Sequence, residues 1–484
     1  PVNSTLVIAN DNGTTPVTVA NGGSTNDTTP RLSGVVSTAE AGGIVRVYDN
    51  ISGNLVQVGS AVVQADGTWS TNSSALTAGT HPLSVTVTDA AGNVSGSTTA
   101  SVIIDTTAPT GLTVAAANNN GSSPVTIANG GFTNDNTPAL SGNAEAGSVV
   151  IVRENGLVIG STTATSGGTW SLTLGTQSDG LHTYSVTATD AAGNVGTASP
   201  IALNVDIGTP AIATGLTVTN NDVTPNVTVA NGGSTNDNTP VLSGSAEANA
   251  IVTVYDGTTV LGSTTASGTG AWSFQTAALT NGSHPLSVTV KDAAGNISPA
   301  SGTYTVVVDT VAPVASTLVI TNDAANVVVP NGGSTNDTTP TLSGTVSAAE
   351  AGGRVSIFDN GVLLGTAIVQ ANGSWTYTTV ALGTGTHPIS VTVTDAAGNI
   401  SSSTSASVII DTTPPAAVTL VANNNNGGSN VVIPNNGATN DNTPLLTGTG
   451  EVGARVSVYD GTLLLGTTTV GSGGTWSFTT TALS

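Results

Sequence analysis

The sequence predicts an all-β fold that is repeated along the chain as a tandem array of β-sandwich domains, and three observations lead to this prediction. Tryptophan occurs five times, at positions 69, 170, 272, 375 and 476, at intervals of 101 to 103 residues. The string Thr-Asn-Asp-[Thr/Asn]-Thr-Pro recurs at nearly the same period, from Thr25, Thr133, Thr235, Thr335 and Thr439. Between these motifs, β-branched residues alternate with polar residues at the period of two that is typical of strands, and no segment shows sustained helical periodicity.

The repeat boundaries follow from a recurring apolar run that closes with aspartate, at Asp105, Asp206, Asp309 and Asp411. They predict four complete repeats, 1–105, 106–206, 207–309 and 310–411, and a fifth, 412–484, that we expect to lack its last two strands. Truncation is our preferred explanation for that fifth repeat, and completion by a donated strand is the alternative. The first and fourth tryptophans, like the second and fifth, are 306 residues apart. This spacing indicates that a three-repeat block was duplicated within a longer array.

The third repeat shows the expected strands most clearly. Residues 214–219 form the first strand, and a second short extended segment follows at 226–230. The other strands are predicted at 240–245, 250–255, 260–266, 271–276, 285–291 and 303–309, with an Asp256-Gly257 turn between the third and fourth of the seven main strands. Seven strands in about 100 residues predict an Ig-like sandwich. Trp272 is expected to point into its core.

Histidine occurs once in each complete repeat, just before or at the start of the sixth strand, at His81, His182, His284 and His387. These residues lie about 100 positions apart, so they cannot form one metal site within a repeat. We interpret them as residues that pack at a corner of the sandwich.

Composition excludes several functions. The chain has 28 acidic and 6 basic residues, and its net charge of −22 opposes binding to nucleic acid or to an anionic membrane surface. The absence of cysteine excludes disulfides and thiolate metal sites. No apolar run is long enough to span a membrane. The sequence has no nucleophile-elbow, zinc-protease or phosphate-loop motif, so we expect no enzymatic activity.

Carboxylates recur in the predicted loops, and the alternating direction of the strands sorts these loops onto the two ends of each repeat. In a linear array, one end of a repeat abuts the opposite end of the next, so each junction should gather acidic residues from both sides. The candidates are Asp27, Asp49 and Asp105 with Glu145 and Asp190 at the first junction; Asp135, Glu154 and Asp206 with Glu247 and Asp292 at the second; Asp237, Asp256 and Asp309 with Glu350 and Asp395 at the third; and Asp337, Asp359 and Asp411 with Glu451 at the fourth.

Like charges gathered in this way would repel, and a hard divalent cation would relieve the repulsion. Ca²⁺ takes six to eight oxygen ligands in flexible geometry, whereas Mg²⁺ demands a stricter octahedron, so the hypothesis is a Ca²⁺ site at each junction. The strongest candidates are the aspartate that ends each repeat, the glutamate after the second strand and the aspartate after the sixth. The alternative is that these Asp and Asn residues simply form turns.

The combined motifs resemble the bacterial Ig-like repeats of giant non-fimbrial adhesins and biofilm-associated proteins of Gram-negative bacteria. The matching strings include Leu-Ser-Gly-x-Ala-Glu-Ala, Val-Tyr-Asp-Gly, Gly-x-Trp-Ser-Phe and Asp-Ala-Ala-Gly-Asn, and the resemblance covers the whole chain. It implies type I secretion, retention at the cell surface or in the biofilm matrix, and Ca²⁺ near the linkers. The segments Asp206-Ile-Gly-Thr-Pro and Arg153-Glu154-Asn155 depart from the pattern, so the second junction is expected to bind metal more weakly.

The leading interpretation is therefore a structural extender, stiffened by Ca²⁺, that serves cell adhesion and biofilm formation. Its partners would be neighbouring repeats of the same chain, possible further copies of itself, and a host or abiotic surface bound through regions outside this sequence. The alternative is that the repeats themselves bind glycans or self-associate laterally into a matrix fibre. The low aromatic content of 3% favours the extender, because sugar-binding clefts are commonly rich in aromatic residues.

Overall fold

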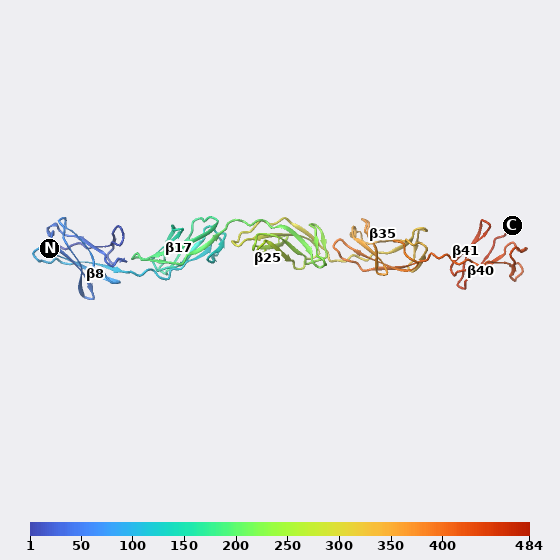
Figure 1. Cartoon of the computed structure of the whole chain (residues 1–484), viewed down its shortest axis with the longest axis horizontal. Coiled ribbons are helices and arrows are strands. Elements are labelled where there is room, and N and C mark those ends of the chain that lie inside the picture. Colours follow the sequence, from blue (N-terminus) through green and yellow to red (C-terminus); the bar gives the residue numbers. More distant parts are fainter. The chain divides into compact units, whose positions relative to one another are not determined.

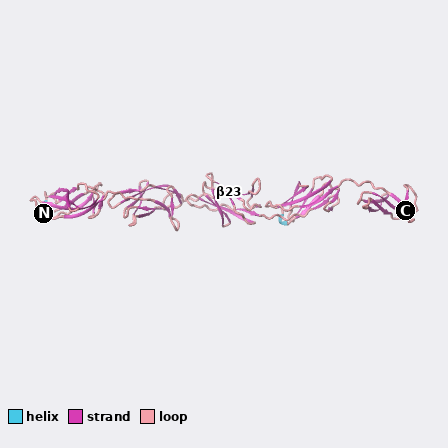
Figure 2. Cartoon of the chain, turned by 90° about the horizontal axis from the view of Figure 1, so that it is seen from below, coloured by secondary structure: helices cyan, strands magenta, loops and turns pink.

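The computed structural model describes residues 1–484, and it confirms the predicted all-β fold. Figure 2 shows strands joined by loops, and the helical segments are two short 3₁₀ turns, η1 (Thr38–Glu40) and η2 (Ala348–Glu350). The chain contains no helix with the length and apolar character that a membrane crossing requires. Residues 1–231, 239–278 and 284–305 form one compact unit, and the remaining residues form a second.

The strands recur with the repeat, and several are labelled in Figure 1. The first repeat contains β1 (Val7–Asn10), β2 (Val17–Val19), β3 (Ser24–Thr25), β4 (Arg31–Val35), β5 (Ile44–Ile51), β6 (Asn54–Val62), β7 (Thr68–Asn72), β8 (Gly79–Thr88) and β9 (Thr98–Ile104). The second contains β10 (Ala115–Asn118), β11 (Val125–Ile127), β12 (Gly131–Thr133), β13 (Ala139–Asn143), β14 (Val149–Glu154), β15 (Leu157–Thr163), β16 (Thr169–Thr173), β17 (Gly180–Thr189), β18 (Val195–Thr197) and β19 (Ile201–Val205).

The later repeats follow the same order. The third contains β20 (Thr214–Asn220), β21 (Val227–Val229), β22 (Ser234–Thr235), β23 (Val241–Ser245), β24 (Ile251–Asp256), β25 (Thr259–Thr265), β26 (Ala271–Gln275), β27 (Gly282–Lys291) and β28 (Tyr304–Val308). The fourth contains β29 (Val319–Asn322), β30 (Val327–Val329), β31 (Gly333–Thr335), β32 (Thr341–Thr345), β33 (Arg354–Asp359), β34 (Val362–Ile368), β35 (Ser374–Thr378), β36 (Gly385–Thr394) and β37 (Thr404–Ile410). The fifth contains β38 (Val421–Asn424), β39 (Val431–Ile433), β40 (Leu445–Thr449), β41 (Arg455–Asp460), β42 (Leu463–Thr469) and β43 (Thr475–Thr479).

Two sheets face each other in each complete sandwich. In the first repeat, the four-stranded sheet has the order β2-β1-β4-β7 and the five-stranded sheet has the order β3-β9-β8-β5-β6. The second repeat has β11-β10-β13-β16 opposite β12-β19-β17-β14-β15, and the fourth has β30-β29-β32-β35 opposite β31-β37-β36-β33-β34. The third has a four-stranded sheet β21-β20-β23-β26, and the fifth has β39-β38-β40-β43 with the hairpin β41-β42.

The segment between the first and second main strands contains two short strands. One is the short extended segment expected at 226–230, which is β21 in the third repeat, and the other, β22, was not predicted. In the first repeat, β2 pairs antiparallel with β1, and the chain then crosses to the other sheet, where β3 pairs parallel with β9. This parallel pairing covers the edge of the last strand, which would otherwise present unpaired backbone groups to other chains. The same crossing occurs at β12 in the second repeat and at β31 in the fourth.

Alternation along the strands builds the core. In the first repeat, Leu83, Val85 and Val87 of β8 are fully buried, and they pack with Val45 and Val47 of the neighbouring β5. Their polar neighbours in the sequence point to the other face of the sheet, as the period of two requires. All five tryptophans are 2% to 5% exposed, which confirms the expected position of Trp272 in the core.

The partner of the indole N–H differs between repeats. The indole nitrogens of Trp69 and Trp375 donate to the hydroxyl oxygens of Ser4 and Ser316 at 2.6 Å. In contrast, the indole N–H of Trp272, like that of Trp476 in the fifth repeat, is buried without an acceptor in the protein. The repeats therefore have the same kind of core, but the buried indole N–H has a hydrogen-bond acceptor in some repeats and none in others.

Candidate functional site

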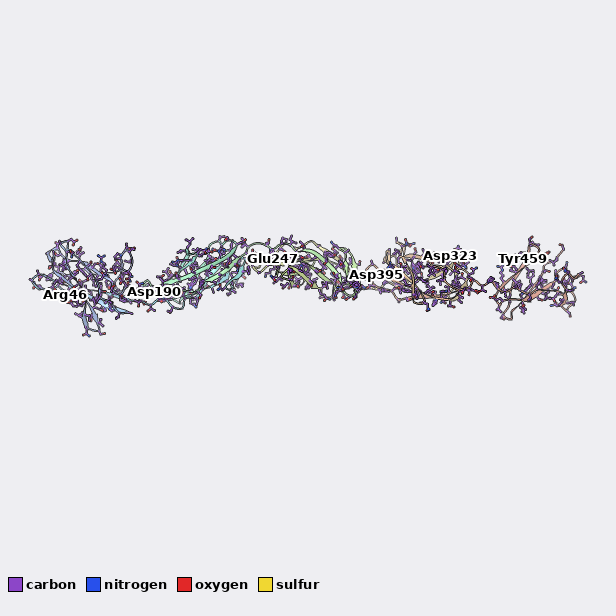
Figure 3. All side chains as sticks on the ribbon, in the orientation of Figure 1. Arg46, Asp190, Glu247, Asp323, Asp395 and Tyr459 are labelled. Carbon is purple, nitrogen blue, oxygen red and sulfur yellow. The ribbon has the colours of Figure 1, made fainter.

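Strand register places the candidate loops at the two ends of a sandwich. In the second repeat, Val149 at the start of β14 pairs with Thr189 at the end of β17, so the loops that carry Glu145 and Asp190 share one end. Gly180 at the start of β17 pairs with Val205 at the end of β19, so Asp206 lies at the other end. Figure 3 labels Asp190, and also Glu247 and Asp395, which occupy loops of the same kind in later repeats.

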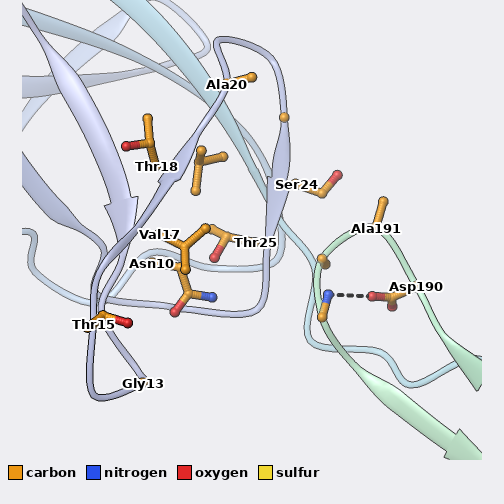
Figure 4. Close-up of a pocket in the computed structure, with 14 residues that line it drawn as sticks. Asn10, Gly13, Thr15, Val17, Thr18, Ala20, Ser24, Thr25, Asp190 and Ala191 are labelled. Atoms are coloured by element: carbon orange, nitrogen blue, oxygen red, sulfur yellow. Dashed lines mark hydrogen bonds between the residues drawn. The ribbon is translucent and has the colours of Figure 1, made fainter. Parts of the chain in front are cut away.

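The aspartate that follows the sixth main strand holds its own loop together. One carboxylate oxygen of Asp190 accepts hydrogen bonds from the backbone nitrogens of Gly193, at 2.8 Å, and Asn194, at 2.9 Å. The bond to Gly193 is drawn in Figure 4. The other oxygen accepts from the Asn194 side chain at 2.9 Å. Equivalent bonds hold the loops at Asp89, Asp292 and Asp395. At Asp89, hydrogen bonds from the side chain and backbone of Asn93 lower the carboxyl pKa.

The asparagine at the end of this loop also contacts the preceding repeat. The side-chain nitrogen of Asn194 donates to the main-chain oxygen of Asp105 at 2.8 Å. Asn296 makes the same bond to Asp206, and Asn399 makes it to Asp309, each also at 2.8 Å. Sequence reasoning placed Asp105, Asp206 and Asp309 at the junctions but missed these asparagine bonds. The recurring Asp-Ala-Ala-Gly-Asn string was the available signal.

The aspartate that ends each repeat begins the linker. One carboxylate oxygen of Asp105 accepts from the backbone nitrogen of Thr107 at 3.0 Å, two residues further along the chain. The corresponding carboxylates accept from Gly208, Val311 and Thr413 at 2.9 to 3.0 Å. One oxygen of each group is thus engaged in shaping the linker. The turn-forming role that the sequence left as an alternative is part of what these residues do.

At the third junction, two aspartates act on the carboxyl group of Glu350. Burial raises the pKa of Glu350, and the negative charges of Asp395 and Asp309 raise it further. Even so, no group of three or more acidic or histidine side chains is close enough to hold a metal ion. The structure therefore brings Asp309, Glu350 and Asp395 into electrostatic contact without forming a closed ligand cage. Glu145 and Glu247, in the corresponding loops, are exposed, as is Glu451 at the fourth junction.

The aspartates of the Thr-Asn-Asp string are engaged within their own repeat. Asp27 is 1% exposed; one of its carboxylate oxygens accepts from the backbone of Thr29 at 2.9 Å and the other from the backbone of Asp11 at 3.0 Å. Asp135, Asp337 and Asp441 accept equivalent pairs of backbone hydrogen bonds, and Asp237 is likewise fully buried. These carboxylates tie two loops together, because backbone N–H groups need an acceptor when they are buried.

The acidic residues at the end of the third main strand pair with the histidines. Asp49 on β5 lies opposite Leu83 of β8, so His81, two residues earlier on the same face, is its diagonal neighbour. The ring Nδ1 of His81 lies 2.6 Å from the Asp49 carboxylate, and its Nε2 lies 2.7 Å from the carbonyl oxygen of Thr77. The same pairing joins Glu154 to His182, Asp256 to His284 and Asp359 to His387, at 2.6 to 2.7 Å.

The pairing in the fourth repeat raises the pKa of its histidine. The Nε2 of His387 lies 2.9 Å from the carbonyl oxygen of Gly383, and its Nδ1 lies 2.7 Å from the Asp359 carboxylate. Burial lowers the pKa of His387, but hydrogen bonds to Asp359 and to the carbonyl of Gly383, with the charge of Asp359, raise it by more. The histidines lie near the start of the sixth main strand, and sequence reasoning, which expected packing residues at a corner, missed their pairing with an acidic residue. A spacing of 28 residues from acid to histidine in three repeats was the available signal.

A hollow of about 600 Å³ lies beside the first junction (Figure 4). Its lining includes Asn10, Val17 and Thr25 of the first repeat and Asp190 and Gly193 from the loop of the second. Small polar and aliphatic groups form its walls, without an aromatic platform or a cationic group. The lining gives no indication of a particular ligand.

Comparison with known proteins identifies the repeats. The model of the bacterial Ig-like domain matches residues 3–106, 109–207, 217–310 and 315–412. No curated protein matches the sequence.

Several solved structures are similar to this chain. One is a tetra-tandem repeat from the extending region of a large adhesion protein, with 23% identity and a TM-score of 0.28, covering 81% of this chain and 100% of that one. Another is a Ca²⁺-stabilized adhesin that helps an Antarctic bacterium reach out and bind ice, with 25% identity and a TM-score of 0.29, covering 79% and 94%. A third is the BSP domain of a biofilm-associated protein, with 14% identity and a TM-score of 0.16, covering 82% and 96%.

Proposed function

The chain belongs to the bacterial Ig-like domain family, and we propose that it is the extender region of a giant cell-surface adhesin or biofilm matrix protein. In this role its repeats serve adhesion and biofilm formation as spacers, outside the cell after type I secretion. The supporting observation is that Asn194, Asn296 and Asn399 each bond to the end of the preceding repeat in the same way. A spacer needs such a recurring junction, because the stiffness of a repeat array resides in its nearest-neighbour contacts.

The proposal includes Ca²⁺ at the junctions. At the third junction, Asp309, Glu350 and Asp395 would supply carboxylate oxygens, and the ion would neutralise the charges that now raise the pKa of Glu350. These hard oxygen donors suit Ca²⁺, although the side chains would have to move closer together to form a complete site. The corresponding groups are Asp105, Glu145 and Asp190 at the first junction, Asp206, Glu247 and Asp292 at the second, and Asp411 with Glu451 at the fourth.

The other predicted ligands are less suited to a metal in this proposal. The Asp27-type carboxylates already accept backbone hydrogen bonds at both oxygens, as Asp27 and Asp337 show. Each Asp49-type carboxylate in the complete repeats faces a histidine. The second junction also contains Lys291, the one lysine of the chain, whose Cε lies near Gly295 of the adjacent loop. This nearby cation is consistent with weaker metal binding there.

Calcium addition to the chelator-treated full chain tests this part of the proposal. A ligand present at about 100 times its Kd adds about 2.7 kcal/mol to the stability of the folded state, which corresponds to a rise in Tm of roughly 10 to 20 °C for a 100-residue domain. Hydrogen exchange of the fourth repeat should report this gain, and Glu350→Gln should reduce it. Glu40→Gln, in the equivalent turn of the first repeat, is the matched control. If calcium leaves both the exchange rate and the scattering-derived length unchanged, the calcium proposal is wrong.

Lateral self-association is the second candidate function, and it rests on the outer strands of the larger sheet in each of two repeats. The β15 and β34 strands lie at a sheet edge, and their residues Leu157 and Val362 are 73% and 68% exposed. Uncovered apolar edge strands can pair with other chains. Beads coated with the full chain should stay dispersed if it is only a spacer, and they should aggregate if the repeats bind one another. Binding of the chain to a glycan array would instead favour glycan recognition.

The proposed role is non-catalytic. The aspartates and asparagines that recur at the ends of the repeats mainly accept or donate hydrogen bonds that shape loops and linkers. In Asp190 and Asn194, for example, the polar side-chain groups bind the loop itself and the preceding repeat. The spacer function needs only that these contacts persist.

A further inference from the structure

The loop with the string Asp-Ala-Ala-Gly-Asn uses both hydrogens of its asparagine amide. In the second repeat, one hydrogen of Asn194 goes to the carboxylate of Asp190 at 2.9 Å and the other to the main-chain oxygen of Asp105 at 2.8 Å. The first bond lies within the loop, and the second reaches the last strand of the preceding repeat. Asn296 and Asn399 divide their hydrogens in the same way.

The same loop also accepts a bond from a second segment of the preceding repeat. The backbone nitrogen of Asn26 donates to the carbonyl oxygen of Ala192 at 3.0 Å. Across the third junction, the backbone nitrogen of Asn236 donates to Ala397 at 3.0 Å. At the first and third junctions the loop is therefore held at two points, by the segment before the second main strand and by the residue that follows the last strand. Two bonds to separate segments restrain rotation about either one.

The loop is already ordered by its own contacts. The Asp190 carboxylate accepts hydrogen bonds from the backbone nitrogens of Gly193 and Asn194. Gly193 has a φ of 96°, a backbone conformation that residues other than glycine rarely adopt. A Cβ atom at Gly193 would also lie 3.4 Å from the side-chain nitrogen of Asn26. Because the loop does not have to be ordered on contact, little conformational entropy opposes its docking.

We propose that Asn194, Asn296 and Asn399 are metal-independent latches that position each repeat against the one before it. The junctions then have a docked arrangement in the absence of any cation, and a bound cation would add stiffness to it. The inference concerns the junctions of the proposed extender and rests on that function for its biological role. Its physical content is separate, because the latch atoms are an amide and a main-chain carbonyl, neither of which depends on a metal.

Distance measurements across the first junction of the full chain test the latch. The sequence has no cysteine, so Ser70→Cys and Ser171→Cys introduce a unique pair of spin-label sites. Both serines are exposed and occupy equivalent positions on β7 and β16. In chelator, the unsubstituted junction should give a narrow distance distribution. Asn194→Ala should increase the ratio of undocked to docked molecules about fivefold, the factor expected when one typical hydrogen bond is lost.

Asn93→Ala is the matched control. Asn93 caps its own loop through Asp89 at 2.9 Å, as Asn194 does through Asp190, but its side chain makes no contact at the first junction. This substitution should leave the distribution across the first junction unchanged. Melting of both variants shows whether loss of the cap alone unfolds a repeat. The latch is refuted if Asn194→Ala leaves the distribution as narrow as Asn93→Ala does, or if the unsubstituted chain is already broad in chelator.

The calcium proposal has a different readout in the same experiment. Calcium added to the unsubstituted labelled chain either narrows the distribution or leaves it unchanged, whatever the result for Asn194→Ala in chelator. A narrow distribution in chelator that calcium does not alter would support the latch and contradict the calcium sites. A broad distribution that only calcium narrows would support the sites and contradict the latch.

Discussion

Replacing Ala213 by serine should stabilise the third repeat, because it supplies an acceptor for the buried indole N–H of Trp272. That N–H has no partner in the protein, and the tryptophan is 5% exposed. In the first repeat, the hydroxyl of Ser4 accepts from the equivalent indole of Trp69 at 2.6 Å. The substitution therefore creates in the third repeat the serine–tryptophan hydrogen bond that the first repeat already has.

The equivalence of the two positions follows from the residue next to each. A Cβ added to the glycine of Leu-Ser-Gly would lie 2.0 Å from the carbonyl oxygen of Thr5 in the first repeat and 3.0 Å from that of Thr214 in the third. Ser4 and Ala213 each directly precede these threonines, and they are 3% and 7% exposed. Alanine thus occupies the place of the serine, and the added hydroxyl would lie in the same buried position.

The expected gain is about 1 to 2 kcal/mol. A buried donor without a partner costs about 1 to 3 kcal/mol, and the new hydroxyl should not introduce a similar cost. In the first repeat, the Ser4 hydroxyl donates to the carbonyl oxygen of Thr5 at 2.7 Å, so its own hydrogen is satisfied. The reverse change, Ser4→Ala, should destabilise the first repeat by a similar amount.

Hydrogen exchange of the full chain measures this effect one repeat at a time. Amides of β26, which contains Trp272, and of its neighbour β23 should exchange about 5 to 30 times more slowly in Ala213→Ser, as 1 to 2 kcal/mol implies. The control is the same substitution combined with Trp272→Phe, which has no indole N–H. The coupling energy of this double-mutant cycle isolates the hydrogen bond. A coupling energy of zero, or faster exchange in the single variant, would refute the reasoning.

Three further predictions concern other contacts within the repeats. Gly34→Ala should destabilise the first repeat by about 1 to 3 kcal/mol, because its Cβ would lie 2.0 Å from the Thr5 carbonyl; an unchanged thermal midpoint would contradict this. The pKa of His387 is raised by its pairing with Asp359, so this pairing should stabilise the fourth repeat fully below about pH 6.5 and lose that effect as pH rises through the folded-state pKa. His387→Gln should flatten the pH dependence of the stability of the fourth repeat, as measured by hydrogen exchange over that range. An unaltered pH profile would exclude the ion pair as the source of that dependence. Asp27→Asn should cost about 1 to 2 kcal/mol, since an amide has one acceptor oxygen for two backbone donors; urea unfolding followed by exchange in β1 and β4 would show no change if those bonds contribute nothing.

Periodicity predicted most of the fold. The tryptophan interval and the alternation within strands such as β8 reflect interactions that are local or that repeat in every unit, so they are visible without coordinates. Of the two short strands that follow the first main strand, the first was expected at 226–230 in the third repeat, and the second, which is β3 in the first repeat, was not. The β3 strand has two residues, and its partner β9 lies almost 80 positions further along the chain. A segment this short has no period of its own, so only the path of the chain between the sheets reveals it.

The candidate site was predicted in part. Sequence reasoning placed Asp309, Glu350 and Asp395 at one junction; the charges of the two aspartates raise the pKa of Glu350, and metal binding there stays a prediction. It did not anticipate that Asp49 faces His81, because that pairing depends on the register of two strands that are not consecutive in the sequence. Acidic residues in loops look alike in the sequence, whether they face a histidine, a backbone amide or another carboxylate.

The sequence by itself determined the repeat, the main strands along the chain and the buried position of Trp272, because burial follows from the period at which apolar side chains occur. Only the tertiary structure decided what each recurring polar group contacts. Asp27 and Asp49 are both acidic residues of the first repeat, yet the first accepts hydrogen bonds from two backbone nitrogens, whereas the second faces the ring of His81. A hydrogen bond depends on positions to within a fraction of an ångström, and these positions are set by strand register and by the neighbouring repeat.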